Sequence, residues 1–166
     1  MDTPTRRTLL GSGVVLLSSL AGCSTFRTER RTEVSGSETA TAALDLREAD
    51  VPSVAIEAQG DGDYRFDVTL YHDDDGEDGY ANWWQVETLA GEQLGRRDLL
   101  HAHSTDPFTR SESITIPDGV DCVVVRGHDQ THSYGGQAMT VGLPDGETNQ
   151  VQQGPDRHPI AERNCP

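Results

Sequence analysis

The sequence predicts an all-β domain, an immunoglobulin- or fibronectin-like antiparallel sandwich of about seven strands, with a small β-barrel as the alternative. Three observations predict it. From about residue 51 onward the chain consists of short apolar runs separated by Gly, Asp and Pro. No stretch of this region as long as an ordinary helix has helical periodicity. Turn residues stand between the runs where hairpins require them.

The clearest strand begins at Tyr64, because Phe66, Val68 and Leu70 alternate there with polar residues and define one buried face. Ala90-Gly91-Glu92 and Pro117-Asp118-Gly119 provide the turns of two hairpins. In chain order the predicted strands are Val54–Ala58, Tyr64–Tyr71, Trp83–Leu89, Gln93–Leu100, Ser111–Ile116, Cys122–His128 and Gln137–Leu143.

The N-terminus has the pattern of an export signal. A charged stretch ending in Arg6-Arg7 precedes an apolar run from Leu9 to Leu20 that is too short to span a bilayer as a helix. The arginine pair resembles a twin-arginine signal, and Leu20-Ala21-Gly22-Cys23 resembles the lipobox of bacterial and archaeal lipoproteins. The resemblance implies cleavage before Cys23, lipid on its thiol and attachment to the outer face of the cytoplasmic membrane. The alternatives are an ordinary signal peptide with an incidental cysteine and an uncleaved short anchor.

These patterns divide the chain into four parts. Residues 1–22 form the predicted signal peptide. Residues 23–48 have almost no large apolar side chains, so they cannot bury enough surface to fold and form a flexible tether. Residues 49–143 form the sandwich, and the polar residues 144–166, with their Gly and Pro, form an irregular C-terminal tail.

The composition is strongly acidic. The chain has 28 Asp and Glu against 13 Lys and Arg, a formal net charge of −15, and every one of the 13 basic residues is arginine. This composition resembles that of haloarchaeal proteins, in which surface carboxylates keep the protein soluble in molar salt. Nucleic acid is an unfavourable partner, because no basic stripe is present to displace counterions from phosphates.

Lipid on Cys23 would leave two cysteines, Cys122 and Cys165, in an exported chain. An even number of remaining cysteines in such a compartment permits one disulfide. The alternative is two independent thiols, one in a strand and one in the tail.

The most function-like pattern is a group of four of the six histidines, found in His101-Ala102-His103 and in His128-Asp129-Gln130-Thr131-His132. Alternate residues of an extended segment point the same way, so His101 and His103 can present two imidazoles to one ion. If the segments meet, His101, His103, His128 and His132 would bind Zn²⁺ or Cu²⁺, with Asp129 and Arg126 supporting them from outside. In the competing interpretations these residues and Arg110 form a network that braces loops, or they contact an organic ligand.

Two other motifs carry little chemistry. The segment from His128 to His132 has Asp where zinc proteases of the HExxH type have Glu, and the valines before it argue against the required helix. The acidic run from Asp73 to Gly79 does not fit the register of an EF-hand and is interpreted as a solvated loop tip, with a calcium site of another type as the alternative.

A further resemblance is carried by Trp83 to Leu89, Leu99 to His103, Pro107 to Ser111 and Val124 to Gly136. Together these segments resemble a group of uncharacterised small exported proteins of bacteria and archaea, over residues 64–143. The resemblance implies no activity, but it makes the histidine segments part of the module.

We therefore expect a lipid-anchored extracytoplasmic β-sandwich that acts as a binding or envelope-associated module without catalysis. Its expected partners are the membrane, through lipid on Cys23, and an envelope protein or small ligand. The alternative function is an extracytoplasmic copper- or zinc-binding protein that uses the histidine cluster.

Overall fold

A computed structural model describes residues 44–166 of the chain. The predicted signal peptide, Cys23 and most of the predicted tether lie outside the described residues. No helix in the described part is long and apolar enough to cross a membrane.

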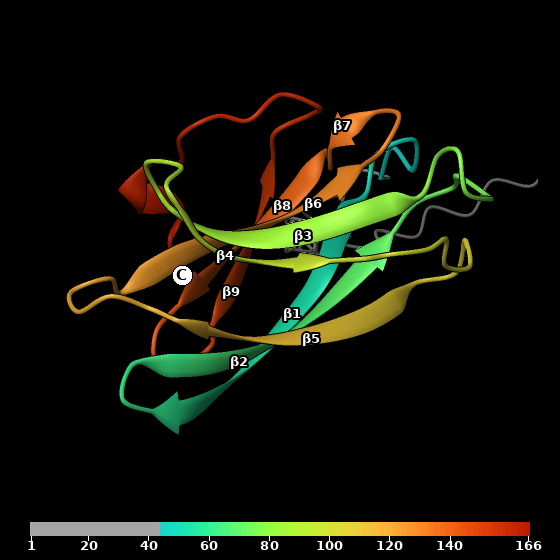
Figure 1. The fold of residues 1–166 in the computed structure, drawn as a ribbon. Coiled ribbons are helices and arrows are strands. Elements are labelled where there is room, and N and C mark those ends of the chain that lie inside the picture. The colour runs from blue at the N-terminus through green and yellow to red at the C-terminus, as the bar shows by residue number, and fades with distance from the viewer. Residues whose placement is uncertain (1–43) are drawn as a thin grey trace, which may run out of the picture. The chain divides into compact units, whose positions relative to one another are not determined.

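The described residues form two antiparallel sheets (Figure 1). The small sheet has the order β1-β2-β5, and the large sheet has the order β4-β3-β6-β8-β9, with the short β7 paired to β6. The strands are β1 (Asp50–Gly60), β2 (Asp63–Tyr71), β3 (Ala81–Thr88), β4 (Gln93–Asp98), β5 (Phe108–Thr115), β6 (Cys122–Asp129), β7 (Ser133–Tyr134), β8 (Gln137–Gly142) and β9 (Thr148–Gln152), followed by a 3₁₀ turn, η1 (Glu162–Asn164).

This strand order is that of an immunoglobulin-like sandwich. Strands β1, β2 and β5 take the places of A, B and E, and β3, β6 and β8 take those of C, F and G, with β4 added beside C. The two sheets are separate, so the predicted sandwich is confirmed over the alternative of a small barrel.

The core lies between the two sheets. The apolar residues whose alternation predicted β2 point into this core. Phe66, Val68 and Leu70 have no exposed surface. Trp84 and Val86 of β3 enter the same core from the large sheet. Burying a side chain of this size contributes about 1.5–3 kcal/mol, so these residues set which face of each strand points inward.

All seven predicted strands are present, although their ends differ by several residues. Two strands were missed, and the prediction of an irregular tail is therefore wrong in part. Strand β9 lies within residues 144–166 and pairs with β8. It was missed because its five residues are almost all polar and give no alternation of apolar and polar side chains. The predicted start of the domain is slightly late, since Glu48 is already buried.

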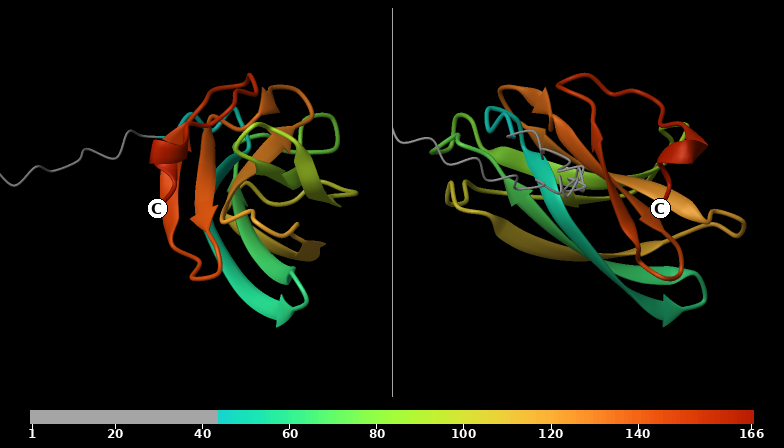
Figure 2. Two further views of the ribbon diagram at one scale, coloured as in Figure 1. Left: turned by 90° about the vertical axis from the view of Figure 1, so that its left-hand side faces the viewer. Right: turned by 180° about the vertical axis from the view of Figure 1, so that it is seen from behind.

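The C-terminal segment covers the outer face of the large sheet (Figures 1 and 2). The backbone N–H of Ile160 donates to the carbonyl of Leu89 at 2.8 Å, and Ile160 packs against Val124 and Ala138. This cover explains why Val123, Val124 and Val125 are all buried, although successive residues of a strand point to opposite faces.

The start of β1 lies very close to two glycines. A Cβ atom added at Gly127 would lie 2.2 Å from the carbonyl oxygen of Ala49, and one added at Gly135 would lie 2.0 Å from the same oxygen. Only residues without a side chain allow this approach, which fixes the first residues of β1 against β6 and β7.

Candidate functional site

Three loops meet at one end of the sandwich, which we call the histidine end (Figure 1). They are residues 72–80 between β2 and β3, 99–107 between β4 and β5, and 130–132 between β6 and β7. The backbone N–H of Ala102 donates to Glu77 at 3.2 Å, and the hydroxyl of Thr131 donates to the carbonyl of Asp78 at 3.3 Å. The sandwich topology therefore brings both predicted histidine segments to the same end.

The four histidines do not form one site, and this part of the metal prediction is corrected by the geometry. The rings of His101 and His103 stack on one another with centroids 4.8 Å apart. His128 and His132 have other partners. Within residues 44–166, the one group of three or more potential ligands whose atoms lie within 4.8 Å of one another contains just one of these histidines, His132.

His128 belongs to an aromatic cluster on the outer face of the large sheet. It lies directly across from Trp83 in the β3–β6 pair, and the two rings stack with centroids 4.2 Å apart. Its Nδ1 is 2.8 Å from the side-chain oxygen of Asn82. Burial, and then the charge of Arg96, lower the pKa of His128. This ring is an uncharged packing residue.

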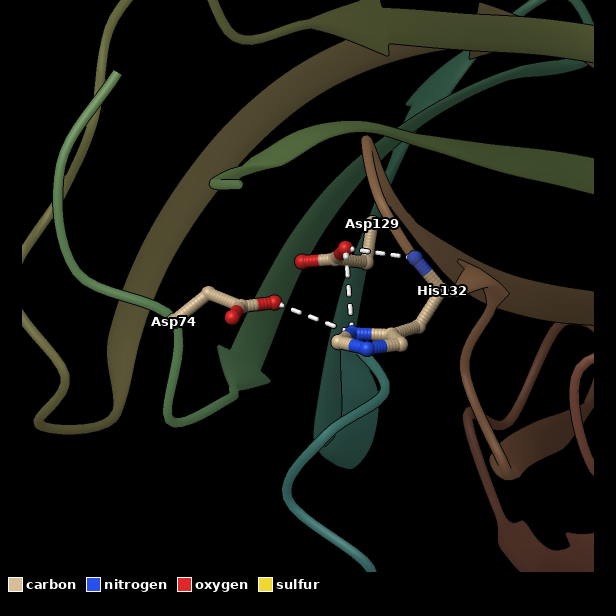
Figure 3. Close-up of side chains that lie close together, drawn as sticks. All are labelled: Asp74, Asp129 and His132. Atoms are coloured by element: carbon tan, nitrogen blue, oxygen red, sulfur yellow. Dashed lines mark hydrogen bonds and ion pairs between the residues drawn. The ribbon is translucent and has the colours of Figure 1, made fainter. Parts of the chain in front are cut away.

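His132 instead lies beside two carboxylates (Figure 3). Its Nδ1 is 3.2 Å from Oδ2 of Asp74 and 3.7 Å from Oδ1 of Asp129. Asp129 is the last residue of β6 and fully buried, and its Oδ1 accepts hydrogen bonds from the backbone of Thr131 at 2.7 Å and of His132 at 2.9 Å. Asp129 and Asp74 therefore both contact His132.

Arg126 forms no hydrogen bond or ion pair with the side chains of the four predicted histidine ligands in the described part of the chain. It forms a buried ion pair with Glu87, Nε to Oε2 at 3.1 Å, on the outer face of the large sheet. Its guanidinium also donates to Gln153 and, at 3.3 Å, to the carbonyl of His158. Arg126 therefore holds the C-terminal segment against the sheet, and does not support a histidine.

A disulfide joins Cys122, at the start of β6, to Cys165, with 43 residues of sequence separation. It attaches the end of the chain to the large sheet beyond η1.

A cavity of about 500 Å³ opens beside the end of β4. Arg96 and Arg97 of β4, His101 and His103 of the following loop, and Arg110 of β5 contribute to its wall. Three arginines in this lining are notable, because residues 44–166 contain eight arginines against 24 carboxylates. The guanidinium carbon of Arg96, however, lies 4.7 Å from the ring centroid of Trp83. The volume lies within the range of small-molecule sites.

Two of these arginines have carboxylate partners in the same wall. Arg96 pairs with Asp98 at 2.6 Å, and Arg97 pairs with Glu112 at 3.1 Å, which joins the edge strands of the two sheets. Arg110 has no carboxylate within 4.0 Å among the described residues. The wall therefore has one guanidinium more than it has carboxylates.

The histidines of the cavity stack on an aromatic support. The ring of His103 lies parallel to that of Phe108, with centroids 4.4 Å apart, and the guanidinium carbon of Arg110 is 5.3 Å from the same phenyl ring. Burial, followed by the charges of Arg110 and His101, lowers the pKa of His103. An uncharged His103 can donate and accept hydrogen bonds while Arg110 provides the charge.

Sequence reasoning missed Asp74 and two of the three cavity arginines, Arg96 and Arg97. Asp74 lies in the acidic run that was interpreted as a solvated loop tip, and no pattern distinguishes it from its neighbours. A signal for the cavity did exist, since Arg96-Arg97 is the one place in residues 44–166 where two arginines are adjacent.

The chain is 64% identical over 129 residues to a protein of Halomicrobium mukohataei that is named "Putative lipoprotein". The aligned region covers 78% of this chain and 64% of the relative, so the chain spans less than two thirds of that protein's length. No family model matches the chain, and no solved structure matches it.

Proposed function

We propose that this protein is a lipid-anchored extracytoplasmic binding module, which takes up a small oxyanion ligand in the cavity between β4 and β5 without transforming it. The observation that carries the proposal is that Arg97 and Arg110 both line that one cavity in an otherwise acidic domain, and that Arg110 has no carboxylate partner among the described residues.

An oxyanion is the ligand class that fits this wall. A guanidinium is planar and presents parallel N–H donors that match a carboxylate or a phosphate. Arg110 is free of carboxylate partners in the described part of the chain, so it is the primary contact, and Arg97 can turn its remaining donors to the same ligand. The stacked Phe108 holds the guanidinium of Arg110 in place beside the cavity.

The same arrangement suits molar salt. At such concentrations the Debye length is about 3 Å, so the overall negative charge of the domain does not repel an anion from a distance. Direct contacts between a guanidinium and an oxyanion act at shorter range than this. An arginine cavity can therefore select an anion that the net charge would exclude in dilute buffer.

The location rests on the N-terminal segment and on the relative. The name of the Halomicrobium protein agrees with the interpretation of Leu20-Ala21-Gly22-Cys23 as a lipobox. Both support export, lipid on Cys23 and attachment to the outer face of the cytoplasmic membrane, with the twin-arginine route suggested by Arg6-Arg7.

The binding proposal is tested with the full chain in mild detergent and molar NaCl. Succinate and phosphate are titrated separately by calorimetry, and the two titrations distinguish a carboxylate site from a phosphate site. We expect saturable binding of one of the two with one site per chain. Arg110→Gln should weaken it by about ten- to a hundredfold, because a hydrogen bond to a charged group contributes about 1.5–3 kcal/mol. The ligand should be recovered chemically unchanged.

Arg163→Gln is the matched control, since Arg163 is exposed on η1 and far along the chain from the cavity. Absence of saturable binding of both anions would overturn the proposal. So would equal weakening by Arg110→Gln and Arg163→Gln.

The anchor has a separate test. Replacing Cys23 by Ser should move the protein from the membrane fraction to the soluble fraction of its host. Retention in the membrane fraction would contradict lipidation at this residue.

A further inference from the structure

We propose that Asp74, Asp129 and His132 bind a divalent transition-metal ion, of the Zn²⁺ or Mn²⁺ class, at the histidine end of the sandwich. This site differs from the four-histidine site predicted from the sequence, and it does not involve the arginine cavity.

The three side chains come from two separate parts of the chain and face one another (Figure 3). Asp74 lies in the loop between β2 and β3, Asp129 is the last residue of β6, and His132 lies in the turn that follows. Each offers one ligand atom, and these atoms all lie within 4.8 Å of one another. The distances from His132 Nδ1 to the two carboxylates are 3.2 and 3.7 Å. Ligand atoms about 2.0–2.2 Å from one ion are separated by roughly 3.0–3.5 Å, so small movements would bring the three atoms to an ion.

A second observation points to a cationic ligand. Oδ2 of Asp129 is fully buried and has no hydrogen-bond partner among residues 44–166. Figure 3 shows this carboxylate projecting toward Asp74. A buried carboxylate oxygen without a partner is strongly unfavourable, since burying a charge is costly unless it is paired or coordinates a metal.

A hydrogen bond donated by His132 does not by itself satisfy both carboxylates of the cluster. A proton on Nδ1 of His132 can serve Asp74, but it leaves Oδ2 of Asp129 without a partner and keeps two carboxylates side by side. A divalent ion would satisfy both carboxylates and the ring nitrogen at once.

The donor set selects the class of ion. One imidazole nitrogen with two carboxylates suits Zn²⁺ and Mn²⁺. Ca²⁺ takes six to eight oxygen ligands, and a set with a histidine and two carboxylates is poor for it. The bound ion would join the loop of residues 72–80 to the β6–β7 turn, in addition to the hydrogen bonds from Thr131 to Asp78 and from the backbone of Gln130 to Tyr80.

The test uses the full chain in mild detergent and molar NaCl after dialysis against chelator. Zn²⁺ and Mn²⁺ are added in separate equilibrium dialyses, and bound metal is measured by mass spectrometry. We expect one equivalent of one of these metals per chain, a raised melting temperature and slower amide exchange in residues 72–80. His132→Gln and Asp74→Asn should each weaken binding at least about tenfold. Both side chains are partly exposed, so these variants should fold.

His101→Gln is the matched control, because it removes a histidine of the same end that lies outside the cluster. The proposal is overturned if neither metal binds, if binding survives His132→Gln and Asp74→Asn, or if His101→Gln weakens it equally. Succinate and phosphate binding should be the same in Asp74→Asn as in the unmodified chain, which separates failure of this site from failure of the anion site.

Discussion

Replacing Arg126 by Met should destabilise the domain by about 3 kcal/mol. Arg126 is 1% exposed and Glu87 is fully buried, so the substitution leaves a carboxylate in the interior without its main partner. Breaking a buried ion pair costs about 3–5 kcal/mol. We expect the lower end, because Arg157 stays 3.4 Å from Oε1 of Glu87. The variant also loses the hydrogen bonds from the guanidinium to Gln153 and to the carbonyl of His158.

The measurement is thermal unfolding in molar NaCl, followed by circular dichroism. For a domain of this size about 3 kcal/mol corresponds to a fall in Tm of about 10 °C. The double variant Glu87→Leu with Arg126→Met should recover much of the loss, because replacing both partners by apolar residues removes the uncompensated charge. The surface variant Arg163→Met should change stability by less than about 0.5 kcal/mol. A loss below 1 kcal/mol for Arg126→Met alone would refute this reasoning.

Three further predictions concern stability. Replacing both Cys122 and Cys165 by Ser should cost about 4 kcal/mol, from the loss of a cross-link over 43 residues; a melting temperature equal to that of the oxidised chain would contradict it. Burial raises the pKa of Asp50 from 3.8 to about 7, so the folded state holds this proton while the unfolded state loses it. The free energy of unfolding should therefore fall by up to about 4 kcal/mol as pH rises from about 4 to 7, relative to Asp50→Asn; parallel urea titrations across this pH range check it, and equal slopes for the two proteins would speak against it. Gly135→Ala should cost at least about 1–3 kcal/mol in thermal unfolding, because its Cβ would collide with the backbone of Ala49; an unchanged Tm would show that β1 can shift.

The fold could be predicted from the sequence where burial leaves a pattern. Alternation in β2 and the valines of β6 identified strands that enter the core, and glycine- and proline-containing turns separated them. Strand β9 could not be predicted, because its backbone pairs with β8 while its side chains are mostly exposed. The outer cover of the large sheet was also missed, since Ile160 is the one apolar residue that it buries there, and the hydrogen bonds of Arg126 that hold it leave no pattern in the sequence.

The site was predictable only in part. The sandwich topology brought both histidine segments to one end, as the sequence suggested, but neighbouring groups decide the role of each ring. His128 lies across from Trp83 and stacks on it, whereas His132 is directed toward Asp74 by the hydrogen bonds of Asp129 to its turn. The contacts of His128 with Trp83 and of His132 with Asp74 join residues more than 40 positions apart, and spacing within a segment carries no information about them.

The central claim, that the arginine cavity binds an oxyanion, is tested most directly by NMR of the arginine Nε–H groups during titration with succinate or phosphate. The spectrum is sparse because the described domain has eight arginines. We predict that the signals of Arg97 and Arg110 shift together with one binding constant, while those of Arg47 and Arg163 stay in place. Equal shifts across all arginines, or none in the cavity with either anion, would contradict the account.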